Sequence, residues 1–337
     1  MKILFIGGNG NISWHCVNEA LKASHEVYVL NREATLNSRR EIQRDVVKLK
    51  GDIRNFDEMQ EILRTRFFDV VCDFICYNEE HAKNVVALFS GKTKQYIFIS
   101  SESVYERKTK NLPFKENCPK NNPENSFAYV RDKLKAEEVF INSFECGAFP
   151  VTIVRPSYTY DTIVPVSLGK NCYTPVVRYL RNRPVLIAGD GNNLWTFTHS
   201  RDFARAFVCL LGNADAIGED YHITADEWLT WNEATEHLLN AINVKNAQVL
   251  HVPLNYLFKT PLASQRDLAY QKVWHNIYDN SKIKNVASGW RAEIPFEKGI
   301  KLTIGWLHEK ESHRRFDKDL DVILEEITLN VQKGKKV

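Results

Sequence analysis

The sequence predicts an α/β fold in which a doubly wound parallel sheet is followed by a smaller C-terminal domain. Two observations lead to this prediction. Over the first ~157 residues, short and almost wholly apolar segments alternate with segments of helical periodicity, as expected of parallel strands that helices cover on both faces. A glycine-rich turn also joins the first apolar segment to the first helix.

The predicted elements follow in chain order. A strand, a helix and a second strand form a βαβ unit over Lys2–Ile6, Ile12–Ala23 and His25–Leu30. Further strands are predicted at Val46–Lys50, Asp69–Ile75, Gln95–Ser100 and Val151–Arg155. Helices are predicted between them at Phe56–Arg64, Glu79–Phe89 and Tyr129–Ser143. After Tyr158 the alternation weakens, and we expect helices at Thr174–Arg181 and Arg201–Leu211 and a strand at His222–Thr224.

This order of elements predicts two domains. Residues 1–157 form the sheet domain, to which 197–225 return. Residues 158–196 and 226–330 form a cap, and residues 331–337 form a basic tail. The cap is therefore built from two separate stretches of the chain.

Composition excludes several classes of protein. The 337 residues are 44% hydrophobic and 26% charged, which suits a folded protein with a large core rather than a disordered chain. The net charge is only +3, so electrostatics do not favour nucleic acid as a partner. No stretch approaches the ~18 apolar residues that a membrane span requires. Seven cysteines without a C-x-x-C pair fit reduced thiols and a cytoplasmic location.

No metal site is predicted. His308 and Glu309 resemble the start of a zinc-protease helix, but the next histidine is His313. Five residues span ~140° of the circumference of a helix, so His308 and His313 do not face one ion together.

The turn after the first strand has the chemistry of a nucleotide-binding loop. Gly7 and Gly10 leave room for a pyrophosphate, whose oxygens are bound by backbone N–H groups at the start of the following helix, near Asn11 and Ile12. An ordinary turn containing glycine is the alternative. The position of the turn, between a strand and a helix of a βαβ unit, favours the binding loop.

The spacing Gly7-x-x-Gly10-x-x-Ser13 resembles the G-x-x-G-x-x-G turn of the extended short-chain dehydrogenase/reductase family, the nucleotide-sugar epimerases and dehydratases. Ser13 replaces the third glycine, where a small residue permits close packing of helix and strand. The resemblance implies a Rossmann-type sheet that binds NAD or NADP, a substrate-binding cap and a homodimer.

The end of the second strand bears on the choice of cofactor. The family usually has an acidic residue there, which favours NAD, whereas this chain has Asn31 and Arg32. An arginine can pair with the 2′-phosphate of NADP, so Arg32, with Arg39 and Arg40 nearby, favours NADP; stacking on adenine or exposure to solvent is the alternative. The resemblance also implies cofactor contacts at Asp52, Ile53, Ile75, Pro156 and Ser157.

Tyr129 and Lys133 are four residues apart on a predicted helix and so face the same way. Nearby positive charge lowers the pKa of a tyrosine from ~10 and makes it a better base. Tyr278 and Lys282 have the same spacing, so the surrounding sequence must decide which of the two pairs is catalytic. The segment from Ser100 to Tyr105 resembles the family's S-S/T-x-x-V-Y-G motif, which implies that Ser101 is catalytic and that Tyr129 is its partner.

The two positions after Ser101 bear on the type of reaction. Dehydratases of the family carry an acidic residue there, often paired with a second one, whereas this chain has Glu102 and then Ser103. Glu102 is a candidate general acid for eliminating water, or else a solvated residue at the end of a strand. Ser103 is a candidate substrate contact.

The chain has no evident arginine after the Gly189-Asp190-Gly191 turn that could bind a substrate diphosphate. Trp195 stands at the position where the resemblance implies that arginine, and an indole can stack on a base or a sugar but cannot form a charged clamp. Arg178, on a predicted helix of the cap, is a candidate replacement, although it could also belong to a solvated helix face.

Three functions remain open from the sequence. The first is an NAD(P)-dependent epimerase or dehydratase that acts on a sugar, with a nucleotide sugar as the favoured substrate, through a transient keto intermediate. The second is an NADPH-dependent carbonyl reductase with the same residues, which Arg32 favours. The third is an RNA-binding protein, because Arg155 to Trp231 also resembles plant chloroplast stem-loop RNA-binding proteins; retention of Ser101, Tyr129 and Lys133 argues against it.

Overall fold

The computed structural model describes residues 1–32, 40–107, 111–169, 172–264 and 272–333. The chain divides into two compact units, each with its own core. The first unit comprises 1–157, 200–224 and 279–291, and the second comprises 158–199, 225–278 and 292–337. Residues 279–291, which the sequence placed in the cap, are thus part of the first unit. Arg39 and most of the basic tail, 334–337, lie outside the described residues.

The first unit is a parallel sheet with helices on both faces. Its strands are β1 (Lys2–Ile6), β2 (Glu26–Asn31), β3 (Val47–Lys50), β4 (Phe68–Asp73), β5 (Thr93–Ile99), β6 (Val151–Pro156) and β10 (Asp220–Ile223). Its α-helices are α1 (Ser13–Lys22), α2 (Phe56–Leu63), α3 (Glu79–Phe89), α4 (Ala128–Glu145), α6 (Ser200–Phe207) and α9 (Ser281–Val286).

Within the described ranges these seven strands join in the order β10-β6-β5-β4-β1-β2-β3, and every pair is parallel. The chain adds β2 and β3 on one side of β1 and then crosses to β4 on the other side. In such a sheet, ligands bind beyond the carboxyl ends of the strands where the order reverses. A ligand is therefore expected to bind at the loops that follow β1 and β4.

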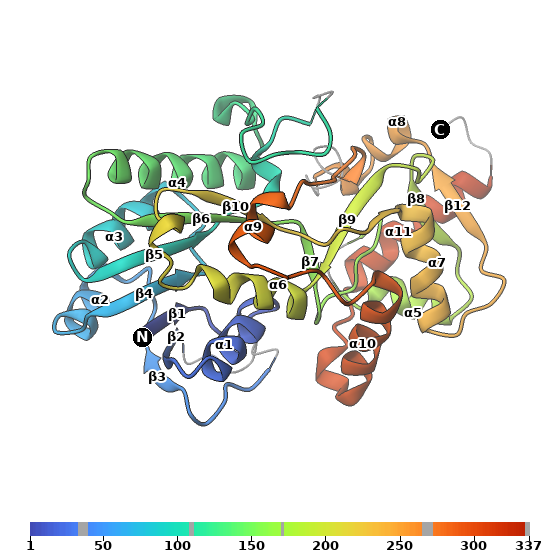
Figure 1. Ribbon diagram of the computed structural model, residues 1–337. Coiled ribbons are helices and arrows are strands. Elements are labelled where there is room, and N and C mark those ends of the chain that lie inside the picture. The colour runs from blue at the N-terminus through green and yellow to red at the C-terminus, as the bar shows by residue number, and fades with distance from the viewer. Residues whose placement is uncertain (33–39, 108–110, 170–171, 265–271, 334–337) are drawn as a thin grey trace. The chain divides into compact units, whose positions relative to one another are not determined.

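Alternation along β1 shows why the strands are apolar on both faces. Ile3 and Phe5 belong to a core shared with α1, α6 and α9, whereas Leu4 and Ile6 belong to a second core shared with α2, α3 and α4. Figure 1 shows the same two layers, with α1 and α6 on one side of the sheet and α2, α3 and α4 on the other. This is the doubly wound architecture that the sequence predicts.

The second unit combines two small sheets with helices. Strands β11 (Trp228–Thr230), β9 (Leu194–His199) and β7 (Tyr158–Tyr160) form one sheet, and β12 (Val249–Val252) pairs with β8 (Val185–Ala188). Its α-helices are α5 (Thr174–Leu180), α7 (Trp231–Ala241), α8 (Leu254–Leu257), α10 (Phe296–Glu309) and α11 (Lys318–Gln332). Among the described residues, no helix is both long enough and apolar enough to cross a membrane.

Candidate active site

The first turn is shaped for close approach of a ligand. Gly7 has φ of +80°, which favours glycine, and a Cβ there would come within 2.7 Å of Ile75. Ser13 closes the turn, since its hydroxyl donates to the Gly7 carbonyl at 2.6 Å and accepts from the Gly10 N–H at 2.9 Å. The serine that replaces the third glycine thus links the two ends of the loop.

The start of α1 fits a pyrophosphate. Ile12 is the N-cap and contributes no side-chain cap, and the first turn of α1 contains no acidic residue. Its backbone N–H groups and the positive end of the helix dipole are therefore not opposed by a carboxylate on that turn. Asn11 is half-buried beside it, and Ile12 packs against the core of the first unit.

The predicted adenosine side of the site lies at the ends of β2 and β3. Asn31 ends β2, and the exposed Arg32 guanidinium lies 4.0 Å from the Asp52 carboxylate. Arg54 binds the same carboxylate with two nitrogens, at 2.8 and 2.6 Å, and this contact holds the pKa of Asp52 below its ordinary value. Ile53 is buried. Asp52 is thus neutralised between two arginines.

The loop after β4 is held by a buried carboxylate that the sequence analysis did not single out. Asp73 Oδ1 accepts the N–H groups of Ile75 at 2.7 Å and Cys76 at 3.0 Å, and Oδ2 accepts the Tyr96 hydroxyl at 2.7 Å. Asp73 and Tyr96 are both fully buried. These contacts fix Ile75, the predicted cofactor contact, close to Gly7.

Lys133 is buried on α4 and points toward the ends of two strands. Its ammonium donates to the Cys76 carbonyl at 2.7 Å and to the Ile99 carbonyl at 2.8 Å. Burial lowers the pKa of Lys133 to about 8. Two of its three N–H donors are thereby used within the described chain, so one remains for a ligand.

Tyr129 is in the first turn of α4 and its side chain is 40% exposed, with the ring stacked on Phe127. Ser101 comes two residues after Ile99, whose carbonyl binds Lys133. The Ser101 hydroxyl accepts from the Ser103 N–H at 3.2 Å and from the Ser103 hydroxyl at 2.9 Å. Ser101, Tyr129 and Lys133 thus belong to one unit, at the carboxyl end of β5 and the start of α4.

Glu102 is not exposed to solvent at the end of a strand, which was one of the two alternatives from the sequence. It is buried, and its carboxylate pairs at 2.8 Å with Arg107, which is also buried and donates to the Glu102 carbonyl at 2.9 Å. An adjacent guanidinium favours the ionised carboxylate, whereas a general acid must carry a proton. The solvated alternative is wrong because both partners are buried.

A second cluster of charges lies along α4, beyond Lys133. Glu137, one helical turn further, accepts two bonds from Arg155 at 2.8 and 2.9 Å and one from Lys120 at 2.8 Å. Arg155 also donates to the Tyr105 hydroxyl at 2.8 Å and to Asp220 at 2.6 Å. These contacts tie α4 to the end of β6, where the predicted cofactor contacts Pro156 and Ser157 are buried.

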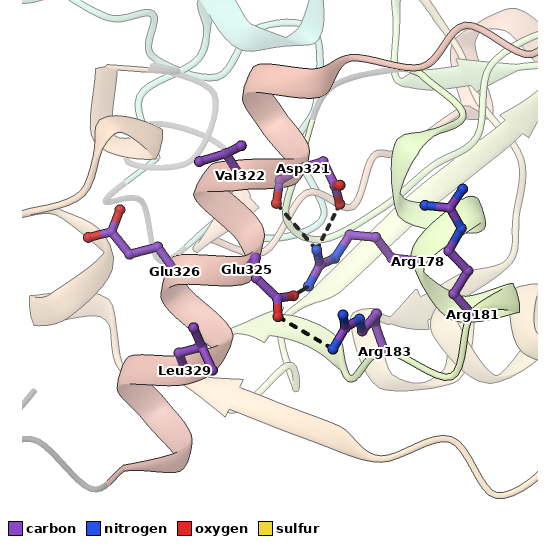
Figure 2. Close-up of a pocket in the computed structure, with 8 residues that line it drawn as sticks. All are labelled: Arg178, Arg181, Arg183, Asp321, Val322, Glu325, Glu326 and Leu329. Carbon is purple, nitrogen blue, oxygen red and sulfur yellow. Dashed lines mark hydrogen bonds and ion pairs between the residues drawn. The ribbon is translucent and has the colours of Figure 1, made fainter.

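The predicted substrate residue Arg178 lies in the second unit, beside a pocket of about 470 Å³. Figure 2 shows its guanidinium directed at α11, where it binds Asp321 at 2.8 Å and Glu325 at 2.9 Å. The pocket is lined by Arg178, Arg181, Arg183, Asp321, Val322, Glu325, Glu326 and Leu329. These ion pairs give Arg178 a structural role, and its contact with a substrate stays a prediction.

Trp195 is also explained by packing within the second unit. It is 1% exposed and its ring lies 5.1 Å from that of Trp231 and 6.3 Å from that of Phe197, centre to centre. Its stacking on a substrate stays a prediction. Within the described ranges, no group of three His, Cys, Asp or Glu side chains is placed to hold a metal ion.

The site residues that the sequence analysis missed had recognisable signals. Asp73 and Arg155 are buried charged residues at or next to the carboxyl ends of largely apolar strands, where burial of a charge costs free energy unless a partner is present. Glu137 continues the spacing of Tyr129 and Lys133 by four more residues along one helix face. A systematic search for charges in apolar strands would have found the first two.

Comparisons with known proteins agree with this geometry. The chain is 24% identical over 318 residues to the chloroplast stem-loop binding protein of 41 kDa b of Arabidopsis thaliana, covering 89% of this chain and 77% of that protein. It is 23% identical to the human dTDP-D-glucose 4,6-dehydratase, covering 91% and 90%. The crystal structure of dTDP-glucose 4,6-dehydratase from Bacillus anthracis in complex with NAD superposes with a TM-score of 0.73 at 21% identity, covering 95% and 99%.

The family is shown by the match of a family model, that of the NAD-dependent epimerase/dehydratase family, to residues 3–224. This range includes the glycine-rich turn, the β4 loop, Ser101, Tyr129 and Lys133. The chain belongs to the NAD-dependent epimerase/dehydratase family.

Proposed function

We propose that this protein is an NAD(P)-dependent epimerase or dehydratase of a nucleotide sugar, acting through a transient keto sugar. The observation that carries the proposal is the position of Lys133, fixed by two backbone carbonyls on the same helix as Tyr129 and next to the strand end that leads to Ser101. The similarity to the human dTDP-D-glucose 4,6-dehydratase supports a nucleotide sugar as the substrate.

The residues present fit the cofactor. Gly7 and the start of α1 would hold the pyrophosphate, Lys133 the nicotinamide ribose, and Arg32 and Asp52 the adenosine end. The cofactor, when bound, accepts and returns a hydride.

Three side chains would take part in proton transfer to and from the sugar. Tyr129 removes the proton of the sugar hydroxyl that is oxidised, and it returns that proton when the keto group is reduced. The Lys133 ammonium stabilises the phenolate form of Tyr129. Ser101 holds the reacting oxygen by a hydrogen bond, which its hydroxyl can donate because Ser103 already supplies two donors to it.

Replacing Tyr129 tests this assignment. We expect Tyr129→Phe to lower turnover by about 10²–10⁴-fold, because a general acid/base is lost, while cofactor affinity stays within about threefold. Turnover is measured by NMR on a panel of nucleotide sugars, and affinity by titration of cofactor fluorescence. Tyr278→Phe, which has the same spacing to a lysine, serves as the control. Wild-type turnover in Tyr129→Phe would contradict the mechanism.

We propose a preference for NADP, with a carbonyl reductase as the second candidate. Arg32 and Arg54 place two guanidinium groups around Asp52, where the 2′-phosphate of NADP would be bound. Cofactor released from the purified protein separates the two functions. Tightly held, stoichiometric cofactor indicates the epimerase or dehydratase, whereas an empty site that consumes NADPH indicates the reductase.

RNA binding is a third candidate, because of the match to the chloroplast stem-loop binding protein. The net charge of +3 gives little general attraction for RNA. Salt-sensitive binding of a stem-loop RNA that survives Tyr129→Phe would favour this candidate. Absence of binding at about 50 mM salt would remove it, since phosphate contacts are strongest at low salt.

We further propose a homodimer in a reducing, cytoplasmic compartment. The resemblance to the extended short-chain dehydrogenases supports pairing, and the seven free cysteines support the compartment. Sedimentation of the purified protein tests the dimer.

A further inference from the structure

We propose that Asp73 is a positioning residue that, together with Tyr96, sets the place and the charge of Lys133. This inference rests on the proposed role of Lys133 in holding the cofactor and assisting Tyr129. Asp73 itself does not bond to Lys133 directly. It acts through the backbone of the β4 loop and through its negative charge.

The backbone route is a chain of hydrogen bonds that connects Asp73 to Lys133 through the β4 loop. Asp73 Oδ1 accepts the N–H groups of Ile75 and Cys76, which fixes the peptide units of this loop. Cys76 then presents its carbonyl to the Lys133 ammonium at 2.7 Å. The second carboxylate oxygen is held by the Tyr96 hydroxyl at 2.7 Å, so the carboxylate cannot rotate freely. A shift of Asp73 therefore shifts one of the two carbonyls that hold Lys133.

The charge route follows from burial. Asp73 accepts all three of these hydrogen bonds. Burial raises the pKa of Asp73 above its ordinary value, and these bonds together with the charge of Lys133 act in the opposite direction. Lys133 is 2% exposed, and burial disfavours its charged form. The carboxylates around it that act against this effect are Asp73 and, on its own helix, Glu137. Glu137 is already paired with Arg155 and Lys120, which leaves Asp73 as the carboxylate that these cations do not neutralise.

Three variants separate the two routes. Asp73→Asn keeps an oxygen for the loop N–H groups but removes the charge. Tyr96→Phe keeps the charge but frees the carboxylate to rotate. Asp69→Asn is the matched control: Asp69 lies at the other end of β4 and likewise accepts a backbone N–H and a side-chain donor, from Lys2 and Lys94. Circular dichroism verifies that each variant is folded, and Tyr96→Phe tests the proposal should Asp73→Asn fail to fold.

The first measurement is the affinity for NADH or NADPH, whichever the wild type binds more tightly, in a double-mutant cycle with Lys133→Met. We expect Asp73→Asn to weaken binding about five- to tenfold and Tyr96→Phe about two- to threefold. Both effects fall below twofold in the Lys133→Met background, because the lysine through which they act is absent. Equal weakening in both backgrounds, or none in either, overturns the proposal.

The second measurement uses the protein without cofactor. Acetic anhydride modifies only unprotonated amines, and mass spectrometry gives the rate at Lys133 relative to the exposed Lys22. At pH 7 we expect Asp73→Asn to raise this rate several-fold and Asp69→Asn to leave it unchanged. An unchanged rate in Asp73→Asn overturns the proposal. If the wild type binds neither cofactor, the proposed function fails, and this second assay alone still decides the role of Asp73.

Discussion

Ser13 shows how one residue can be tolerated at a position that the family usually reserves for glycine. Its side chain is 1% exposed, and a glycine would leave the Gly7 carbonyl and the Gly10 N–H without this shared hydroxyl. The hydroxyl therefore links the two ends of the loop for which we propose pyrophosphate binding. The sequence indicated only that serine is small; the bonds depend on the turn geometry.

Removal of this hydroxyl should affect both stability and binding. We expect Ser13→Ala to lower the free energy of unfolding by about 1–2 kcal/mol, because two partly buried backbone groups, the Gly7 carbonyl and the Gly10 N–H, lose their shared partner. Cofactor affinity should fall about two- to fivefold because the loop is less preorganised. Urea unfolding and fluorescence titration measure the two effects. The control is Ser143→Ala, since the Ser143 hydroxyl donates within α4 to Val139 at 2.7 Å. A Ser13→Ala variant as stable as wild type would contradict this explanation.

Helix α4 shows what spacing can and cannot predict. The four-residue interval of Tyr129 and Lys133 placed both on one face, and the structure agrees in placing them on one helix. The acceptors of Lys133 could not be predicted, because Cys76 and Ile99 lie 57 and 34 residues away and meet it only through the order of the strands. Local pattern predicts faces of elements, whereas partners depend on topology.

The contact between α5 and α11 gives a prediction for Arg178. Its guanidinium also bonds the buried Thr328, so removing it breaks several charge-assisted bonds at once. We expect Arg178→Met to lower the free energy of unfolding by about 1–3 kcal/mol, with no large change in substrate KM. Arg181→Met, at an exposed residue of the same pocket, should change stability by less than about 0.5 kcal/mol. A raised KM with unchanged thermal stability would instead support a substrate contact at Arg178.

At the scale of the whole molecule, the first unit was more predictable than the second. Each predicted strand of the parallel sheet is present, with ends shifted by at most two residues. Most of these strands are buried on both faces and are therefore largely apolar, although β3 has only one buried residue. In the second unit β8 and β12 are only four residues long. Only one residue of β12 is buried, so its sequence shows no clear alternation of buried and exposed positions. Their pairing joins Val185 to Val249, a separation that periodicity does not reveal.

The buried charge network of the first unit predicts how its stability depends on pH. Burial and the adjacent Arg155 lower the pKa of His222 from 6.5 to about 3. Burial alone would raise the pKa of Glu137, but Arg155 and Lys120 lower it from 4.5 to about 2. In both cases the unfolded chain binds a proton at a higher pH than the folded protein. Stability is therefore lost as the pH falls, first below about 6.5 through His222 and then below about 4.5 through Glu137.

His222→Gln should separate the two contributions. The glutamine amide can still bond to the Tyr105 hydroxyl, which accepts or donates to His222 at 2.6 Å, but it does not titrate. We expect the stability of this variant to change less between pH 7 and pH 5 than that of the wild type, while the further loss below about pH 4.5 remains. Glu137→Gln should show the reverse pattern, with the upper loss kept and the lower one reduced. Urea unfolding followed by circular dichroism from about pH 2.5 to pH 8 measures both curves, and wild-type slopes in both variants would contradict the assignment.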